Sequence, residues 1–273
     1  MRNIDNNDWQ KKIIHYCDEF NIPIKYLRDI LNEPKVIPMI RGKAFEFSVM
    51  VTLQRILSKN DWKVDKFSIN AQTGFHDVDV RIAHLKSKKI IKVECKLAKK
   101  QSYRLHKDGH SEIRVKCMRS RTLGPGMIKI LAPKLKIESK ILAVHNDQYL
   151  PTDFDVVVTS IGNSFYRTNL QTGAFEFLPN KIEIEFLKKL GFNGNDLRAF
   201  AFNQIYIAHS RDLVIGSQRE VKCTRKNCNN QNLCGFIPNY PIIYFDKNTN
   251  LPTNGWIALE KAETIFSSFI KNL

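Results

Sequence analysis

The sequence lacks any apolar run that approaches the roughly eighteen residues needed to cross a membrane. Its first residues are polar and contain no signal-peptide core. From these two absences we expect a soluble protein of the cytoplasm with no membrane partner. In that compartment the six cysteines are not expected to form structural disulfides.

Several signatures of catalytic sites are also missing. The chain has no Gly-x-x-x-x-Gly-Lys-Ser/Thr phosphate loop, so nothing in it predicts an ATP-driven motor. Neither a Gly-x-Ser-x-Gly elbow nor a His-Glu-x-x-His motif is present, which argues against the usual serine hydrolases and zinc proteases. No low-complexity linker divides the 273 residues, and 43% of them are hydrophobic, enough for a sizeable core. We therefore expect a single domain with elaborations.

Acidic residues are scarce relative to basic ones. The chain has 27 Asp and Glu against 43 Lys and Arg, a net charge of +16. Residues 86–140 alone hold 17 basic and 4 acidic side chains. Such a concentrated positive field predicts a polyanionic partner, and nucleic acid is the first choice. A membrane surface is the second, but this segment contains no evident basic amphipathic helix.

Beside this basic segment, acids gather in residues 77–96, which read as two short strands joined by a polar turn. In each strand apolar residues alternate with charged ones, so Asp77 and Asp79 share one face of the first strand. Glu94 and Lys96 share one face of the second strand. Pairing of the two strands as a hairpin would bring Asp79, Glu94 and Lys96 together at one edge of a sheet.

Two carboxylates and an ammonium group in one place suit metal-assisted phosphodiester hydrolysis. Mg²⁺ prefers hard oxygen ligands and is held in proteins by one or two carboxylates plus substrate phosphate oxygens. A neighbouring lysine can orient the attacking water and offset developing charge. The alternative is an exposed hairpin whose charges are solvated. Glu94, however, lies in a nearly continuous apolar run, which is typical of a central strand.

The spacing of these residues resembles a known family. Asp79, a gap of fourteen residues, and then Glu94-Cys95-Lys96 on a hydrophobic strand resemble the core of the PD-(D/E)xK nuclease superfamily, over roughly residues 40–100. Glu46 matches the glutamate of that family's leading helix, although it could instead be a surface acid that complements the helix dipole. The family's proline before the aspartate is missing here. This leaves Asp77 and Asp79 both open as the metal ligand, with Asp79 favoured.

The resemblance implies a fold and an activity. It implies an α/β (mixed α+β) protein with a central mixed β-sheet flanked by helices, in a single nuclease domain spanning residues 1–273. The restriction-endonuclease-like core would occupy about residues 40–170, with extra C-terminal elements. Apart from the resemblance, the cysteines near the C-terminal end predict a subdomain at about residues 210–240. The implied activity is a Mg²⁺-dependent endonuclease that cuts double-stranded DNA at a specific sequence, as type II restriction enzymes do.

The resemblance also implies roles and partners. Asp79, Glu94 and the backbone carbonyl of Cys95 would hold Mg²⁺, Lys96 would position the attacking water, and Glu46 would face the site. A palindromic target would favour a homodimer, and a cognate DNA methyltransferase is expected in the same system. Two alternatives stay open. One is a structure-selective repair or recombination nuclease, and the other is a non-catalytic, metal-containing protein that binds nucleic acid.

Two basic segments are candidates for DNA contact. The resemblance places substrate-facing residues directly after the second strand: Lys99, Lys100, Gln101 and Arg104. A loop of arginines, hydroxyls and glycines follows at residues 119–126. Arg119 and Arg121 are its recognition candidates, because arginine can pair with guanine or with phosphate. The alternative for both segments is a solvated loop.

Three further cysteines lie within one short, polar segment: Cys223, Cys228 and Cys234. Thiolates at such spacing could bind Zn²⁺ with a fourth ligand from elsewhere, for which Cys117 and His209 are candidates. An iron–sulfur cluster is a second hypothesis. The spacing departs from the usual Cys-x-x-Cys, so ordinary free cysteines are the alternative.

Apolar periodicity predicts the other elements. Helices are expected at residues 7–20, 24–32, 42–58, 127–142 (interrupted at Pro133), 181–190, 196–209 and 256–273, and strands at 62–69, 112–118, 153–166 and 242–245. Asp153 and Asp155 form a rival carboxylate pair, but no lysine follows them at the required offset. We therefore expect them to be strand-edge residues.

Overall fold

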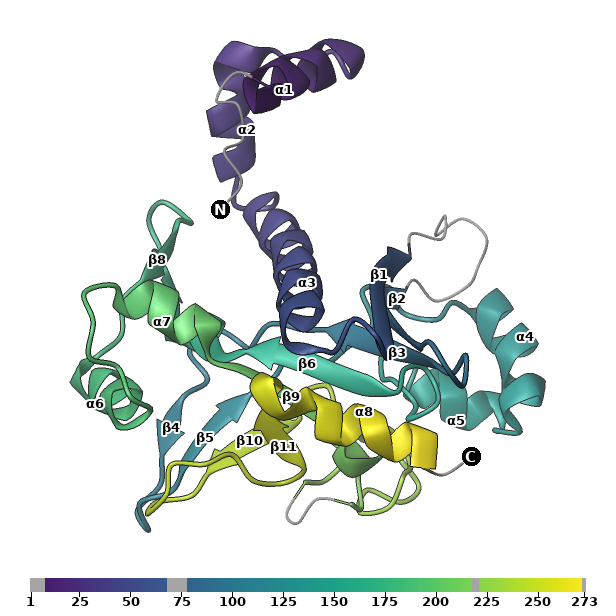
Figure 1. Cartoon of the computed structure of the whole chain (residues 1–273). Helices are drawn as coiled ribbons and strands as arrows, with labels where there is room; N and C mark the ends of the chain where they lie inside the picture. Colours follow the sequence, from purple (N-terminus) through teal and green to yellow (C-terminus); the bar gives the residue numbers. More distant parts are fainter. Residues whose placement is uncertain (1–7, 68–77, 218–220, 272–273) are drawn as a thin grey trace.

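A mixed six-stranded sheet forms the centre of the structure, a computed structural model that describes residues 8–67, 78–217 and 221–271 (Figure 1). The strand order is β1-β2-β3-β6-β9-β11, in which β3 and β6 run parallel and all other neighbours run antiparallel. Two smaller sheets have the orders β10-β5-β4 and β7-β8. The expected mixed α/β class, with helices around a central mixed sheet, is confirmed.

The helices are α1 (Asp8–Glu19), α2 (Leu27–Asn32), α3 (Ile37–Ile56), α4 (Pro125–Leu135), α5 (Ser139–Val144), α6 (Lys181–Lys189), α7 (Leu197–Asn203) and α8 (Ala262–Lys271). The strands are β1 (Trp62–Phe67), β2 (Val78–His84), β3 (Ile90–Cys95), β4 (Arg104–Leu105), β5 (Ser111–Arg114), β6 (Val156–Ser160), β7 (Tyr166–Thr168), β8 (Phe175–Phe177), β9 (Ile205–His209), β10 (Ile242–Phe245) and β11 (Trp256–Ala258). Among the described helices, none combines the length and the apolarity that crossing a membrane requires.

The expected hairpin is formed by β2 and β3. Val80 pairs with Val93 and Ile82 with Ile91, and all four side chains are fully buried. The alternation of apolar and charged residues fixes this register, because a slip by one residue would turn the buried side chains outward. On its other side β3 pairs in parallel with β6, which places β3 in the interior of the sheet.

One face of the sheet is covered by α3 and α8. Phe45, Val49 and Leu53 recur at helical spacing on α3 and share a buried cluster with Phe266 of α8. The helix α3 begins at Ile37, earlier than the expected start at residue 42. The proline at its N-terminal end is tolerated there, because the first turn leaves its N–H groups unpaired in any case.

The opposite face is covered by the small sheet β10-β5-β4 and by aromatic side chains. Phe165, Phe186 and Trp256 belong to the buried cluster on this side. Burial of each such side chain contributes about 2–3 kcal/mol relative to exposure. Val157 of β6 belongs to the same cluster and is the register partner of Glu94. The Glu94 side chain therefore points toward this face.

Two expected helices are wrong in part, because each includes a strand. Residues 196–209 form α7 and then β9, in which Ile205 packs on one face of the sheet and Tyr206 on the other. A strand buried on both faces is apolar throughout and lacks the alternation that identifies strands. Residues 256–273 likewise begin with β11 before α8 starts at Ala262.

Two expected boundaries also move. The interruption expected at Pro133 falls later, because Pro133 lies inside α4. The helix ends at Leu135 and is followed by its cap, Lys136, which adopts the left-handed conformation with φ of 54°. The strand expected over residues 153–166 is shorter. It ends at Ser160, whose hydroxyl accepts the N–H of Gly162 and starts a 3₁₀ turn.

The N-terminal arm, which we define as residues 8–33, lies beyond the free end of α3 and away from the sheet (Figure 1). Within α1 and α2 only Cys17 is buried. Trp9, Tyr16 and Phe20 expose 48%, 55% and 57% of their surface. The arm therefore has almost no core of its own.

Candidate functional site

The hairpin end brings together the charged residues that the sequence singles out. Asp79 on β2 accepts the backbone N–H of Cys95 through Oδ2 at 2.8 Å. Glu94 accepts a hydrogen bond from Lys96 Nζ through Oε1 at 2.6 Å, with only 11% and 19% of the two side chains exposed. The expected meeting of Asp79, Glu94 and Lys96 at one edge of the hairpin is thus present. Asp77, the other candidate ligand, lies outside the described residues.

Glu46 reaches this cluster from α3. Its side chain is 9% exposed and lies 2.9 Å from Lys43 Nζ. It also forms a close ion pair with Lys66 of β1. The alternative role as a surface acid at the helix start is wrong, because the residue is buried and α3 begins at Ile37. Three carboxylates from two strands and one helix therefore share one neighbourhood.

Crowding of negative charge changes the protonation of the cluster. Burial, followed by the charges of Glu94 and Glu46, raises the pKa of Asp79 to about 8. Burial also acts to lower the pKa of Lys96, but the Glu94 carboxylate and Tyr149 raise it well above its ordinary value. At neutral pH Lys96 is therefore an ammonium group, suited to orienting a water or offsetting charge rather than to taking a proton.

Tyr149 is a site residue that the sequence analysis missed. Its hydroxyl donates to Glu94 Oε1 at 2.9 Å. The Lys96 ammonium lies 5.4 Å from the centre of its ring. Only 5% of Tyr149 is exposed. No motif surrounds it, and its 55-residue distance from Glu94 leaves no local spacing that could have identified it.

The expectation that Arg119 reads DNA is wrong, because its side chain is buried. Only 7% of the residue is exposed, and its Nε donates to the Gln148 carbonyl at 2.9 Å. The guanidinium pairs with Asp153 and lies 5.0 Å from the centre of the Tyr149 ring. Arg119 thus packs against Tyr149, the residue that donates a hydrogen bond to Glu94.

The other DNA-contact candidates lie at or near the surface. Exposed side chains belong to Lys99, Gln101, Arg104 and Arg121. Lys100 is partly buried, donates to Thr168 Oγ1 at 2.7 Å, and has its pKa lowered by burial and by the charges of Arg41 and Lys116. The Nη2 of Arg41 is buried without a hydrogen-bond partner among the described residues. Of these cations, Lys100 lies within electrostatic reach of both Arg41 and Lys116.

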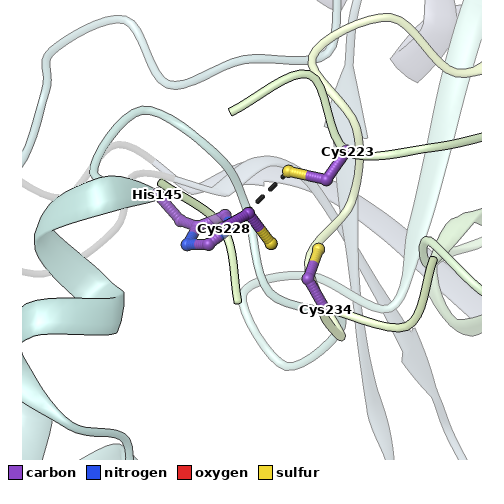
Figure 2. Close-up of side chains that lie close together, drawn as sticks. All are labelled: His145, Cys223, Cys228 and Cys234. Atoms are coloured by element: carbon purple, nitrogen blue, oxygen red, sulfur yellow. Dashed lines mark hydrogen bonds between the residues drawn. The ribbon is translucent and has the colours of Figure 1, made fainter. Parts of the chain in front are cut away.

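A second cluster joins His145, at the end of α5, to the cysteine segment (Figure 2). The ligand atoms of His145, Cys223, Cys228 and Cys234 all lie within 4.8 Å of one another. This group can hold a metal ion, with donor atoms typical of zinc sites. The spacing of the three cysteines could not reveal the histidine ligand, because His145 lies 78 residues before Cys223.

The two fourth ligands expected from the sequence are wrong. Cys117 is fully buried on the side of Lys96 and Glu94, and burial raises its pKa to about 12. His209 instead stacks on Phe269, with ring centres 4.7 Å apart. The position next to the three cysteines is taken by His145.

Comparison of the chain with protein-family models, curated proteins and solved structures finds no match. What the two clusters do therefore has to follow from their own geometry and chemistry. The two clusters are linked through residues 145–149, which contribute His145 to the second cluster and Tyr149 to the first.

The raised pKa of Asp79 predicts how the stability of the metal-free protein depends on pH. Between its ordinary pKa of 3.8 and about 8, the folded protein keeps a proton that the unfolded chain releases, so stability falls as the pH rises through this window. We expect Asp79→Asn to remove this fall. Between pH 5 and about pH 8 the fall is about 4 kcal/mol. At about 2–4 °C per kcal/mol, the melting temperature of the variant should gain about 8–16 °C on the wild type.

Differential scanning fluorimetry in the presence of EDTA measures this difference. The matched control is Asp61→Asn, because hydrogen bonds from Lys86 and Ser58 lower the pKa of Asp61 and it does not titrate in this range. A constant difference between Asp79→Asn and wild type across the range would contradict the assignment of a shared, desolvated charge cluster.

Proposed function

We propose that the chain is a Mg²⁺-dependent endonuclease that hydrolyses phosphodiester bonds of double-stranded DNA at a specific sequence, as type II restriction enzymes do. The observation that carries the proposal is the gathering of Asp79, Glu94 and Lys96 at one hairpin end, with Glu46 arriving from α3. These are the residues that the resemblance to PD-(D/E)xK nucleases selects. A restriction-endonuclease-like core at about residues 40–170 is part of the same proposal.

The donor groups of the cluster fit Mg²⁺. Asp79 and Glu94 offer carboxylate oxygens, and the N–H of Cys95 points to Asp79. Because the N–H and C=O of one residue point to the same side of a strand, the Cys95 carbonyl also faces the Asp79 side. Hard oxygen donors of this kind suit Mg²⁺. When bound, the ion would polarise the scissile phosphate and lower the pKa of the attacking water.

The residues of the chain then have separate tasks. The Lys96 ammonium, kept charged by Glu94, orients the attacking water and offsets charge that develops on the phosphate. Tyr149 fixes the Glu94 carboxylate by donating to Oε1. Glu46 holds the amino groups of Lys43 and Lys66 beside the cluster, where they can meet phosphate oxygens.

The positive charge of the chain supports DNA as the substrate. Lys100 lies within electrostatic reach of Arg41 and Lys116, and the segment that follows the hairpin carries most of the basic excess. Phosphate contacts by such side chains position a duplex without reading its sequence. In a restriction system a cognate DNA methyltransferase is the expected partner, because host DNA contains the same target sites.

We propose that the N-terminal arm pairs with a second copy of the chain. It exposes large apolar side chains yet carries four basic and five acidic residues, so it lacks the positive charge expected of a DNA-binding surface. Against the strongly basic remainder, this nearly neutral, apolar surface suits a protein partner. A dimer would supply one catalytic centre for each DNA strand.

A digest tests the proposed activity. Wild-type protein should cut unmethylated phage and plasmid DNA into discrete fragments with Mg²⁺ and not with EDTA. We expect Glu94→Gln to lower the rate by at least about 100-fold, the usual cost of losing one precisely placed electrostatic contact. The control is Glu260→Gln, an exposed glutamate outside the cluster, which should cut like wild type.

Cleavage by Glu94→Gln at the wild-type rate would overturn the proposed site. Preference for junctions or free ends over plasmid sequence would favour the structure-selective nuclease. Salt-dependent binding to every duplex without cutting, unchanged in Asp79→Asn, would favour a non-catalytic binding protein.

Light scattering coupled to gel filtration tests whether the N-terminal arm pairs two copies of the chain. We expect the wild type to elute with the mass of two chains and the double variant Ile14→Glu, Phe20→Glu to elute as a monomer, because two charges would enter an apolar interface. Leu170→Glu is the control, since this exposed leucine (97%) lies outside the arm. A monomeric wild type at tens of micromolar, or a dimeric double variant, would contradict the proposal.

A further inference from the structure

We propose that His145, Cys223, Cys228 and Cys234 bind one Zn²⁺ ion in a closed site, and that this ion orients Glu94 through Tyr149. The first part stands on the cluster alone. The second rests on the proposed function of Glu94. Figure 2 shows the imidazole and the three thiol groups converging from α5 and from the cysteine segment.

The four ligands have the chemistry of a structural zinc site. Three thiolates and one imidazole complete a tetrahedral shell and leave no position open for water. With zinc bonds of about 2.0–2.3 Å, ligand atoms lie about 3.5–3.8 Å apart. The donor atoms here are within 4.8 Å of one another, so a small contraction suffices. An iron–sulfur cluster is disfavoured, since it is usually held by four cysteines.

The environment of His145 prepares it as a ligand. Its Nδ1 lies 2.9 Å from the Ile141 carbonyl, which can only accept, so Nδ1 carries the proton. In the neutral ring Nε2 is then unprotonated, and it lies 3.5 Å from Cys223 Sγ. The ring stacks on Phe236 at 4.2 Å, and only 1% of His145 is exposed. Carbonyl contacts of this kind commonly fix the orientation of zinc-bound histidines.

The segment that carries the cysteines has little else to order it. Residues 221–237 are described throughout and form neither a helix nor a strand. Cys223 and Phe236 are buried in it, whereas Cys228 and Cys234 are partly exposed. A metal ion that joins three points of such a segment to α5 would supply the ordering that secondary structure does not.

By binding His145, the same ion would hold in place the segment of residues 145–149, which ends at Tyr149. Asp147 pairs with Arg225 of the cysteine segment. Tyr149 accepts the N–H of Ile237 through its carbonyl at 2.8 Å and donates its hydroxyl to Glu94. Residues 145–149 thus carry a zinc ligand at one end and the tyrosine that positions Glu94 at the other. Loss of zinc is expected to release Tyr149 and misplace Glu94.

Metal analysis of the full chain, purified without chelator, tests the site. We expect one zinc per chain in the wild type and in Cys17→Ser, a buried cysteine outside the cluster. Zinc should be lost in Cys228→Ser. Replacement of zinc by Co²⁺ should give the intense visible absorption of a tetrahedral thiolate site. Absence of zinc from the wild type, iron in its place, or full zinc in Cys228→Ser would overturn the site.

Binding of Mn²⁺ to protein purified without chelator, followed by electron paramagnetic resonance, tests the coupling without requiring activity. We expect Tyr149→Phe and Cys228→Ser to weaken Mn²⁺ binding by about tenfold, as is usual when a residue that orients a metal ligand is lost. The matched control is Tyr206→Phe, a buried tyrosine whose hydroxyl is directed to Gln204 rather than to a residue of either cluster. It should bind Mn²⁺ like the wild type.

The possible failures of the two proposals differ. Unchanged Mn²⁺ affinity in Tyr149→Phe or in Cys228→Ser would overturn the coupling and leave the nuclease proposal intact. No Mn²⁺ binding by the wild type would overturn the catalytic metal site, and with it the coupling, while the zinc count would be unaffected.

Discussion

The structure depends on a concentration of negative charge at the end of the β2–β3 hairpin. Asp79, Glu94 and Glu46 lie in a neighbourhood from which water is largely removed, and the pKa of Asp79 rises to about 8 as a result. Groups of like charge buried together cost free energy unless cations compensate them. Lys96 compensates Glu94 and the pair Lys43 and Lys66 compensates Glu46. Strongly shifted pKa values of this kind cluster at functional sites.

Several parts of the fold hold this concentration in place. The parallel pairing of β3 with β6 fixes the backbone on which Glu94 lies. Asp155, at the entry to β6, accepts the backbone N–H of Lys92 at 2.7 Å and so ties the two strands together. Behind Glu94, Tyr149 is enclosed by Arg119 and its partner Asp153. Asp153 and Asp155, the rival carboxylate pair, thus have structural roles. Asp153 pairs with Arg119, and Asp155 accepts the N–H of Lys92.

The sequence could predict what depends on local periodicity. Alternation in residues 77–96 was sufficient to predict the hairpin and the meeting of Asp79 with Glu94. It could not predict β9, whose two faces are both buried, or the burial of Arg119, which is decided by a partner 34 residues away. The same limit applies to Tyr149 and His145. Each reaches its cluster through tertiary packing of segments that are far apart in the chain, and no spacing rule records such contacts.

A calorimetric titration of the protein, purified without chelator, with Mg²⁺ at pH 7 in two buffers of different ionisation enthalpy tests the central claim most directly. Because Asp79 is protonated at this pH, binding by the wild type should release close to one proton, and Asp79→Asn should bind Mg²⁺ at least about tenfold more weakly without that release. Equal affinity and equal proton release in the two proteins would show that Mg²⁺ does not bind at this cluster and would contradict the account.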